Sequence, residues 1–247
     1  MPLDPGLLLN RRYRIDHLHK LGTNGAVYRA LDTTLGVPVA VKENLVAEFS
    51  FQLQFTREAR LLAFFRHPNI PHGADHFVID DGQFLAMDFI EGENLSEWVT
   101  HDSLPADRLI ETLLGIFDAL TYIHSRTPPV IHRDVNASNI ILSTHRRPFL
   151  VDFGSANVAN DVSPTGRIDA RTDQYSLAAT LYTLLTLQIP ADALERAMGR
   201  ETLKPARTLN PTIPSHVEAA LERALAVKPD DRYPDIVHFR HALVNGP

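Results

Sequence analysis

The sequence contains no cysteine, so disulfide bonds and thiolate metal sites are excluded. It also has no excess of basic residues, because 24 Lys and Arg against 30 Asp and Glu give a net charge of −6. Proteins that bind nucleic acids or anionic membranes through general electrostatics usually carry a basic excess. We therefore expect no nucleic-acid partner.

Long apolar runs are missing as well. The longest stretch without a charged residue, Gln174–Ala191, contains Gln, Ser, several Thr and a Pro. We expect it to form a buried helix and not a membrane span. Residues 1–10 show no basic stretch followed by an apolar core, so we expect no signal peptide, no membrane segment and a cytoplasmic protein.

The pattern of the chain changes near residue 90. Before it, short β-type runs such as Val37–Val41 and Phe84–Met87 are bounded by turn residues, and one stretch around Phe55 has helical spacing. After it, apolar residues recur mainly at helical spacing. The sequence therefore predicts an α+β chain with two lobes, a small sheet with one helix over about residues 12–89 and a mostly helical part over about 90–245.

Three polar residues stand in an order typical of phosphoryl transfer. Asp134 follows His132-Arg133, Asn139 comes five residues later, and Asp152-Phe153-Gly154 begins thirteen residues after Asn139. In this chemistry one Asp orients the attacking hydroxyl, a nearby Asn faces a metal ion, and a second Asp at a strand end holds Mg²⁺ between phosphates. An isolated Asp-Phe-Gly is usually a plain turn. Both motifs together, flanked by apolar strands, predict that Asp134 and Asn139 are catalytic and that Asn139 and Asp152 bind Mg²⁺.

The first half of the chain supplies two matching residues. Lys42 ends the apolar run Val39-Ala40-Val41 and fits a strand that carries a phosphate-binding lysine. Glu58, sixteen residues later on the expected helix, fits its ion-pair partner. Taken alone, Lys42 would be an ordinary surface lysine and Glu58 part of a solvated helical face. The two downstream motifs favour catalytic roles for both.

With these motifs the chain, from about Asn10 to Leu243, resembles the catalytic domain of bacterial serine/threonine protein kinases of the eukaryotic-like type. The resemblance implies a single protein kinase domain over residues 1–247, with a small antiparallel β lobe that carries one helix and a larger, mostly helical lobe. It also implies ATP and Mg²⁺ as cofactors and a protein substrate or regulatory partner. Further stretches that carry the resemblance are His67–Pro71, Met87–Gly92, Arg171–Leu177 and Pro229–Tyr233.

The resemblance also implies roles for single residues. Met87 would guard the back of the adenine pocket, the backbone of Asp88 and Ile90 would bond the adenine, and Asp173 would anchor the catalytic loop. The full set expected to bind the nucleotide, in which Val27, Ala40 and Ile141 enclose the ring, is Leu21, Gly22, Gly25, Val27, Ala40, Lys42, Met87, Asp88, Ile90, Ile141 and Asp152.

Two departures from the family pattern affect the nucleotide site. The phosphate-covering loop, Leu21–Tyr28, is two residues shorter than usual and has two glycines, although Asn24 could adopt the left-handed conformation of a tight turn. Fewer backbone N–H groups then reach the phosphates. Asn136 stands where these kinases usually have a lysine that touches the transferred phosphate, and losing such a donor costs on the order of 10²–10³ in rate.

The third and largest departure is the activation segment. Only eighteen residues, Ser155–Thr172, separate the Asp-Phe-Gly motif from the next family motif, and no Ala-Pro-Glu follows. We expect Arg232 to lack its usual glutamate partner, with Asp161 or Asp169 as substitutes. The arginine of the catalytic loop has only Thr165 as a candidate phosphorylated partner.

Three functions stay open on this basis. The first is an active serine/threonine protein kinase, and the second is a pseudokinase that acts as a regulatory or docking module. The third is a small-molecule kinase of the aminoglycoside-phosphotransferase type. The short activation segment favours the second, while the catalytic-loop motif, Asp173 and Arg232 count against the third. We favour the first, because every residue expected to touch the metal or start the chemistry is present.

Overall fold

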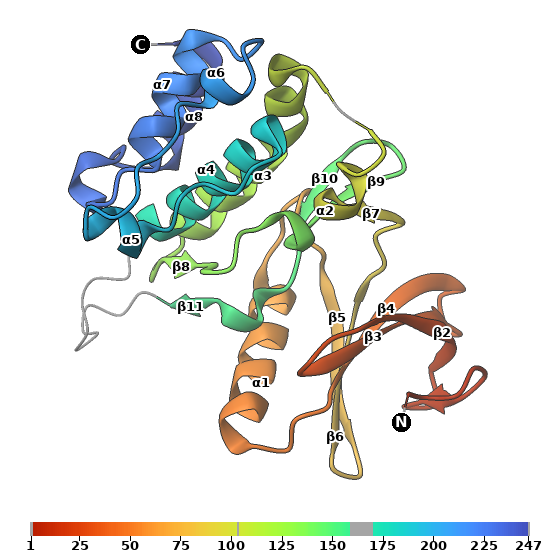
Figure 1. Cartoon of the computed structure of the whole chain (residues 1–247). Helices are drawn as coiled ribbons and strands as arrows, with labels where there is room; N and C mark the ends of the chain where they lie inside the picture. The colour runs from red at the N-terminus through yellow and green to blue at the C-terminus, as the bar shows by residue number, and fades with distance from the viewer. Residues whose placement is uncertain (1, 103, 159–169, 247) are drawn as a thin grey trace. The chain divides into compact units, whose positions relative to one another are not determined.

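The computed structural model describes residues 2–102, 104–158 and 170–246. The chain forms two compact units (Figure 1). The first unit contains the residues up to Glu91 together with Val151–Gly154, and the second contains Gly92–Leu150 and the residues from Ser155 onward.

An antiparallel sheet with one helix makes up most of the first unit. The strand order is β1-β2-β3-β4-β6-β5, and every neighbouring pair runs antiparallel. The elements are β1 (Leu8–Leu9), β2 (Tyr13–Leu21), β3 (Gly25–Asp32), β4 (Val37–Asn44), α1 (Phe49–Phe64), β5 (Gly73–Ile79) and β6 (Gly82–Asp88).

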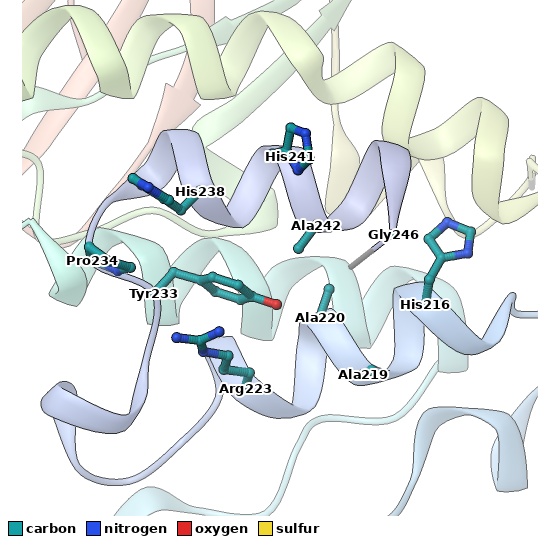
Figure 2. A pocket seen from close by; sticks show the side chains of 10 residues that line it. All are labelled: His216, Ala219, Ala220, Arg223, Tyr233, Pro234, His238, His241, Ala242 and Gly246. Carbon is teal, nitrogen blue, oxygen red and sulfur yellow. The ribbon is translucent and has the colours of Figure 1, made fainter.

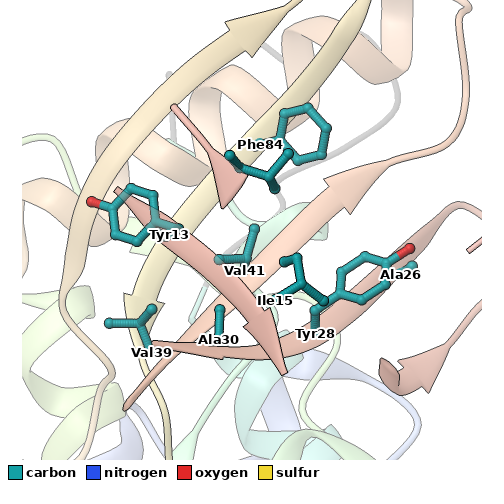
Figure 3. Close-up of a cluster of buried hydrophobic side chains, with 10 residues drawn as sticks. Tyr13, Ile15, Ala26, Tyr28, Ala30, Val39, Val41 and Phe84 are labelled. Atoms are coloured by element: carbon teal, nitrogen blue, oxygen red, sulfur yellow. The ribbon is translucent and has the colours of Figure 1, made fainter. Parts of the chain in front are cut away.

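The hydrophobic core of this unit lies on one face of the sheet. Every second residue of β3 is buried, as expected for a strand with one face toward a core. Tyr13 of β2 stacks on Phe77 of β5 with ring centroids 5.6 Å apart, although three strands separate β2 from β5, so the sheet curves around its core. The buried cluster consists of Leu9, Tyr13, Ile15, Ala26, Tyr28, Ala30, Val39, Val41, Phe84 and Ala86 (Figure 3).

Helix α1 packs closely against β5. A Cβ atom on Gly73 of β5 would lie 3.0 Å from the Leu62 Cβ atom and 3.1 Å from the backbone nitrogen of Ala63, so only glycine fits this approach without a shift. The buried face of the helix includes Phe55 and Leu62, as the sequence predicts, and also the carboxylate residue Glu58. A buried carboxylate requires a partner, so Glu58 is expected to be paired with a cation.

The second unit is mostly helical. Its elements are β7 (Gly92–Asn94), α2 (Leu95–Trp98), α3 (Ala106–His124), β8 (Val130–Ile131), η1 (Ala137–Asn139), β9 (Ile140–Ser143), β10 (Pro148–Leu150), β11 (Asn157–Val158), α4 (Arg171–Thr186), α5 (Ala193–Ala197), α6 (Ala206–Leu209), α7 (Ser215–Ala224), η3 (Pro229–Asp231) and α8 (Ile236–Asn245). The η2 turn (Phe153–Ser155) joins residues of both units.

Aromatic and aliphatic side chains hold the helices of this unit together. Phe117 of α3 meets Phe239 of α8 with ring centroids 5.5 Å apart, and Phe239 stacks on Tyr233 at 5.7 Å. The buried helix expected within Gln174–Ala191 is present as α4. It ends at Thr186, because Leu187 adopts a left-handed conformation with φ of 55°, and the residues after it leave the core.

The predicted fold class is confirmed, since the chain combines an antiparallel sheet with a mostly helical part. In the part of the chain that the structure describes, no helix combines the length and the apolar character needed to cross a membrane.

Arg12, which precedes β2, forms an ion pair with Asp32, the last residue of β3. Asp32 is 1% exposed and receives hydrogen bonds from Arg12 Nη2 at 2.6 Å and Arg12 Nε at 3.0 Å. Its Oδ1 atom also accepts the backbone N–H groups of Thr34 and Leu35. The hydrogen bonds from Arg12 lower the pKa of Asp32 below its usual value of 3.8, against the opposing effect of burial.

This shift predicts how stability depends on pH. Because the folded-state pKa of Asp32 is lower than the unfolded one, its stabilisation is present above about pH 4 and is lost as the pH falls through the folded-state pKa. We expect Asp32→Asn to lower the urea midpoint at about pH 7, measured by circular dichroism, and the difference from wild type to shrink toward about pH 3. A difference of constant size over this range would contradict this assignment.

Candidate active site

The turn between β2 and β3 contains three of the expected nucleotide-binding residues. The Gly22 N–H donates to the Gly25 carbonyl at 2.9 Å, which closes a tight turn after Leu21. A Cβ atom on Gly25 would lie 2.7 Å from the Glu43 carbonyl oxygen, so the neighbouring strand requires glycine there. The turn forms without the left-handed conformation that we expected at Asn24, since Asn24 has no positive φ.

One face of the sheet brings together the residues expected around the adenine. Val27 pairs with Lys42, and Ala40 pairs with Met87, in the registers of β3–β4 and β4–β6. Paired residues in a sheet point to the same side, and these alternate with the core residues Val39 and Val41. Val27, Ala40, Lys42 and Met87 therefore share the face opposite the core.

The end of β6 carries the expected adenine-bonding backbone. The Asp88 N–H donates to the His72 carbonyl at 3.0 Å, and the Asp88 carboxylate accepts the His72 N–H at 2.9 Å. Any adenine contact from the Asp88 backbone must then use its carbonyl oxygen. Ile90 follows outside the strand and is half-buried, while Ile141 lies on β9 in the second unit.

Lys42, Glu58 and Asp152 form one charged group in the first unit. Lys42 Nζ lies 2.8 Å from both carboxylate oxygens of Glu58 and 2.9 Å from Asp152 Oδ1. The Glu58 side chain is only 2% exposed, whereas that of Asp152 is 48% exposed. The expected ion pair between Lys42 and Glu58 is confirmed, and Asp152 adds a carboxylate that remains open to solvent.

The charges in this group and their burial shift the pKa values of both Lys42 and Glu58. Burial would lower the pKa of Lys42, but the carboxylates of Glu58 and Asp152 outweigh it and raise the pKa above its usual value. Burial raises the pKa of Glu58, with Asp152 adding to this effect and Lys42 opposing it. The amine is thus held protonated next to a carboxylate that solvent can reach.

The Asp-Phe-Gly turn packs against Phe65, the residue that follows α1. Phe153 is 1% exposed, and its ring centroid lies 5.4 Å from that of Phe65. Asp152 adopts a left-handed backbone conformation with φ of 63°, which costs about 1–3 kcal/mol for a residue other than glycine and is common at functional sites. A Cβ atom on Gly154 would lie 3.3 Å from Asp152 Oδ1 and 3.4 Å from Glu58 Oε2, so a side chain there would be in contact with the charged group.

The second group of site residues lies in the catalytic-loop motif of the second unit. Asn139 Nδ2 donates to Asp134 Oδ2 at 2.9 Å, and Asn136 Nδ2 donates to Asp134 Oδ1 at 2.9 Å. Two neutral amides thus hold both oxygens of the Asp134 carboxylate. Because the amide nitrogen of Asn139 faces Asp134, its Oδ1 atom is the one left for a cation.

Asn136 has more contacts than the sequence suggested. Its Oδ1 atom accepts the backbone N–H groups of Ser138 at 2.9 Å and Asn139 at 3.2 Å, which caps the η1 turn. From the sequence we expected Asn136 only to remove the positive charge that a lysine would supply at this position. The structure shows that its amide orients Asp134 and stabilises the turn that carries Asn139.

Asp173 anchors this loop, as expected. It is 0% exposed and accepts the backbone N–H groups of His132 at 2.8 Å and Arg133 at 2.7 Å. Arg133 has a positive φ of 70°, so Asp173 bonds directly to the strained residue before Asp134. His124 Nε2 lies 2.8 Å from Asp173 Oδ2, a contact that the sequence analysis missed. A polar residue at the end of the otherwise apolar buried face of α3 was the available signal.

Arg232 has no glutamate partner among the described residues, as expected, but it has backbone partners that the sequence did not indicate. Its guanidinium donates to the backbone carbonyls of Ala226 at 2.8 Å, Arg171 at 2.9 Å and Val227 at 3.1 Å, and it lies over the Tyr175 ring at 4.6 Å. Arg232 is therefore well bonded without a glutamate from the activation segment. The expectations for Asp161, Thr165 and Asp169 lie outside the described residues.

We expect Asp173→Asn to lower the free energy of unfolding by about 3 kcal/mol, because the amide offers one acceptor oxygen and turns an NH₂ group toward N–H donors. Urea unfolding followed by circular dichroism measures this. The matched control is Asp118→Asn, which removes an exposed ion pair with Arg240 and should change stability by less than about 0.5 kcal/mol. Equal stabilities of both variants would contradict the anchoring role.

Comparison with known proteins agrees with this geometry. Residues 17–241 match the protein kinase domain family. The chain is 32% identical to the serine/threonine-protein kinase Pkn1 of Myxococcus xanthus. The match covers 90% of this chain and 36% of Pkn1. It is 27% identical to the probable serine/threonine-protein kinase YbdM of Bacillus subtilis, covering 98% of this chain and 92% of YbdM. Several other curated relatives are longer, and the chain spans less than half of their length.

A solved structure extends the similarity to three dimensions. The crystal structure of the Mycobacterium tuberculosis PknI kinase domain superposes with a TM-score of 0.79 at 27% identity, covering 100% of both chains. The family match spans nearly the whole chain and includes Lys42, Glu58, Asp134, Asn139 and Asp152. The chain belongs to the protein kinase domain family.

Proposed function

We propose that this chain is an ATP-dependent protein kinase that transfers the γ-phosphate of Mg·ATP to a serine or threonine hydroxyl of a protein. The observation that carries the proposal is the contact of Lys42 with both the buried Glu58 and the half-exposed Asp152. A protonated amine fixed beside an open carboxylate suits a triphosphate and its divalent cation. The names of the relatives support the choice of serine and threonine.

Nucleotide binding is assigned mainly to the first unit. Lys42 would bind the α- and β-phosphates, and the Leu21, Gly22 and Gly25 turn would cover them. Val27, Ala40 and Met87, which share a sheet face with Lys42, would enclose the adenine together with Ile141. The Asp88 carbonyl and the Ile90 backbone would bond its edge.

In this proposal Asp152 and Asn139 would hold Mg²⁺ together with the phosphates of the nucleotide. Asp152 offers a carboxylate and Asn139 an amide oxygen, and both are the hard oxygen ligands that Mg²⁺ prefers. Among the described residues, no three His, Cys, Asp or Glu side chains gather as a metal site would require. Bound there with the nucleotide, Mg²⁺ would neutralise charge on the phosphates, while Lys42 holds Asp152 in place.

Asp134 would orient the attacking hydroxyl and accept its proton. Its two oxygens are held by Asn136 and Asn139, so its carboxylate is fixed before the substrate arrives. Such preorganisation lowers the cost of reaching the reactive geometry. The proposal requires the Asp134 group and the Lys42 group to face the same nucleotide within one kinase domain of residues 1–247. We also propose that the protein is cytoplasmic and does not bind nucleic acid.

The decisive experiment is a phosphorylation assay with labelled ATP and a generic protein substrate. We expect Asp134→Asn and Lys42→Met each to lower the rate by on the order of 10²–10⁴, because each removes a group that acts on the reacting phosphate or hydroxyl. The controls are Asp81→Asn and Lys204→Met, exposed residues outside the site, which should keep the wild-type rate.

Transfer by Asp134→Asn at the wild-type rate would contradict the proposal. A rise in melting temperature with Mg·ATP but no transfer by wild type would instead indicate a nucleotide-binding regulatory module. Transfer only to a small hydroxylated compound would indicate a small-molecule kinase.

The role of Asn136 has its own test. We expect Asn136→Ala to lower kcat about tenfold while KM for Mg·ATP changes little, because its amide contacts Asp134 and not the nucleotide. The matched control is Asn210→Ala, which removes an amide bonded to Leu185 and Thr212 and should leave kcat unchanged. A higher KM for Mg·ATP at constant kcat would show that Asn136 acts by holding the nucleotide.

A further inference from the structure

A pocket of about 360 Å³ lies between α7 and α8 in the second unit. It shares no residue with the site described above. Its volume is within the range of about 300–1,000 Å³ that is typical of small-molecule sites. The lining residues, drawn in Figure 2, are His216, Ala219, Ala220, Arg223, Tyr233, Pro234, His238, His241, Ala242 and Gly246.

The sequence of the two helices explains why a space remains there. On α7 the lining residues recur three and four positions apart, from His216 to Arg223, so they form one stripe of the helix. On α8, His238, His241 and Ala242 follow the same spacing. Alanines occupy the middle of the pocket, and their small side chains leave open the volume that larger residues would fill.

Tyr233 gives the pocket a fixed polar group. Its side chain is only 9% exposed, its ring stacks on Phe239, and its backbone N–H and carbonyl are both bonded to the buried amide of Gln174. Figure 2 shows the hydroxyl pointing into the space between the two helices. Within the described part of the chain this hydroxyl has no hydrogen-bond partner. A tyrosine hydroxyl can both donate and accept hydrogen bonds, so this one is available to a ligand.

Arg223 is the one Lys, Arg, Asp or Glu residue among those that line the pocket. The Arg223 guanidinium lies over the Tyr233 ring at 4.3 Å and forms no ion pair with any residue that the structure describes. The lining includes three histidines and no carboxylate. Asp235 lies beside the pocket, but its carboxylate is bonded to His238 Nδ1 at 2.7 Å. Arg223 is therefore a cation at the pocket without an ion-pair partner among the described residues.

We propose that this pocket binds a small organic anion. The apolar body of the ligand would fill the space lined by Ala219, Ala220 and Ala242, and one of its oxygens would accept a hydrogen bond from the Tyr233 hydroxyl. Its carboxylate or phosphate would pair with Arg223, whose planar guanidinium suits both groups. The Arg223 guanidinium lies over the ring of Tyr233, so both residues line neighbouring parts of the pocket.

The test uses 2-naphthoate as the probe and 2-naphthamide as its neutral counterpart of the same shape. Each is titrated into the ¹⁵N-labelled full chain without nucleotide, and the amides around Lys42 report any probe that binds at the nucleotide site instead. We expect saturable binding of 2-naphthoate with amide shifts concentrated on α7 and α8. We also expect at least tenfold weaker binding of 2-naphthamide, since the pairing with Arg223 is lost.

Three variants check the assigned contacts. Arg223→Ala should weaken 2-naphthoate binding at least tenfold, and Tyr233→Phe should weaken it several-fold by removing only the hydroxyl. Ala219→Leu, at an exposed helix position, should abolish binding by filling the pocket without disturbing the fold. The control is Arg14→Ala, which removes an exposed arginine of β2 and should not change the affinity.

Any of three results would overturn the proposal. The first is no saturable binding of 2-naphthoate, and the second is equal affinity for the anion and the amide. The third is binding that Ala219→Leu leaves unchanged or that shifts amides elsewhere in the chain. Because the readout is binding and not phosphate transfer, the outcome is independent of whether the chain is an active kinase.

Discussion

The carboxylate of Glu58 sits where only 2% of its side chain is exposed, and the arrangement of the first unit follows from that constraint. A charge at such a position needs an opposite charge and hydrogen bonds, and removing one partner of a buried pair costs about 3–5 kcal/mol. Lys42 is that partner. A shift of β4 by one residue against β3 would turn Lys42 toward the hydrophobic cluster and leave Glu58 unpaired. The ion pair and the strand register therefore stabilise each other.

In the catalytic-loop motif of the second unit, the carboxylate of Asp134 is held by neutral donors. Asp173 receives two backbone N–H groups, and Asp134 receives two side-chain amides. Neutral donors orient a carboxylate without cancelling its charge, which suits a residue that must attract a proton. In the first unit, by contrast, a cation lies between the carboxylates, which suits a site for phosphates. Each unit thus has the electrostatic character that its proposed role requires.

The sequence predicted those features that depend on local periodicity and on motif spacing. Strand β4 was predicted because its apolar run is bounded by turn residues, and the pairing of Lys42 with Glu58 because the two residues match the family's lysine and glutamate motifs. The partners of Arg232 were not predictable in this way. The hydrogen-bond acceptors described for it are backbone carbonyls, which every residue carries, so no residue type marks them.

Other features depend on how distant segments meet. The contact of His124 with Asp173 joins residues 49 positions apart, and the pocket between α7 and α8 exists only because alanines face each other there. The end of α4 at Thr186 was also missed, because Leu187 has no sequence feature that indicates a left-handed conformation. Each of these outcomes is decided by tertiary packing and not by local pattern.

The contacts show that the departures from the family pattern differ in their effect on the site. The missing glutamate leaves no defect at Arg232, because three carbonyls and the Tyr175 ring satisfy its guanidinium. Asn136 has a different effect, since it replaces a mobile cation with an amide that is already bonded to Asp134 and to the η1 turn. Such an amide improves the orientation of Asp134 but supplies no positive charge to the transferred phosphate. In an active enzyme the charge developing on that phosphate would then be stabilised by Lys42 and the metal held at Asp152, which makes the Lys42–Glu58–Asp152 group more important here than in a kinase with the usual lysine.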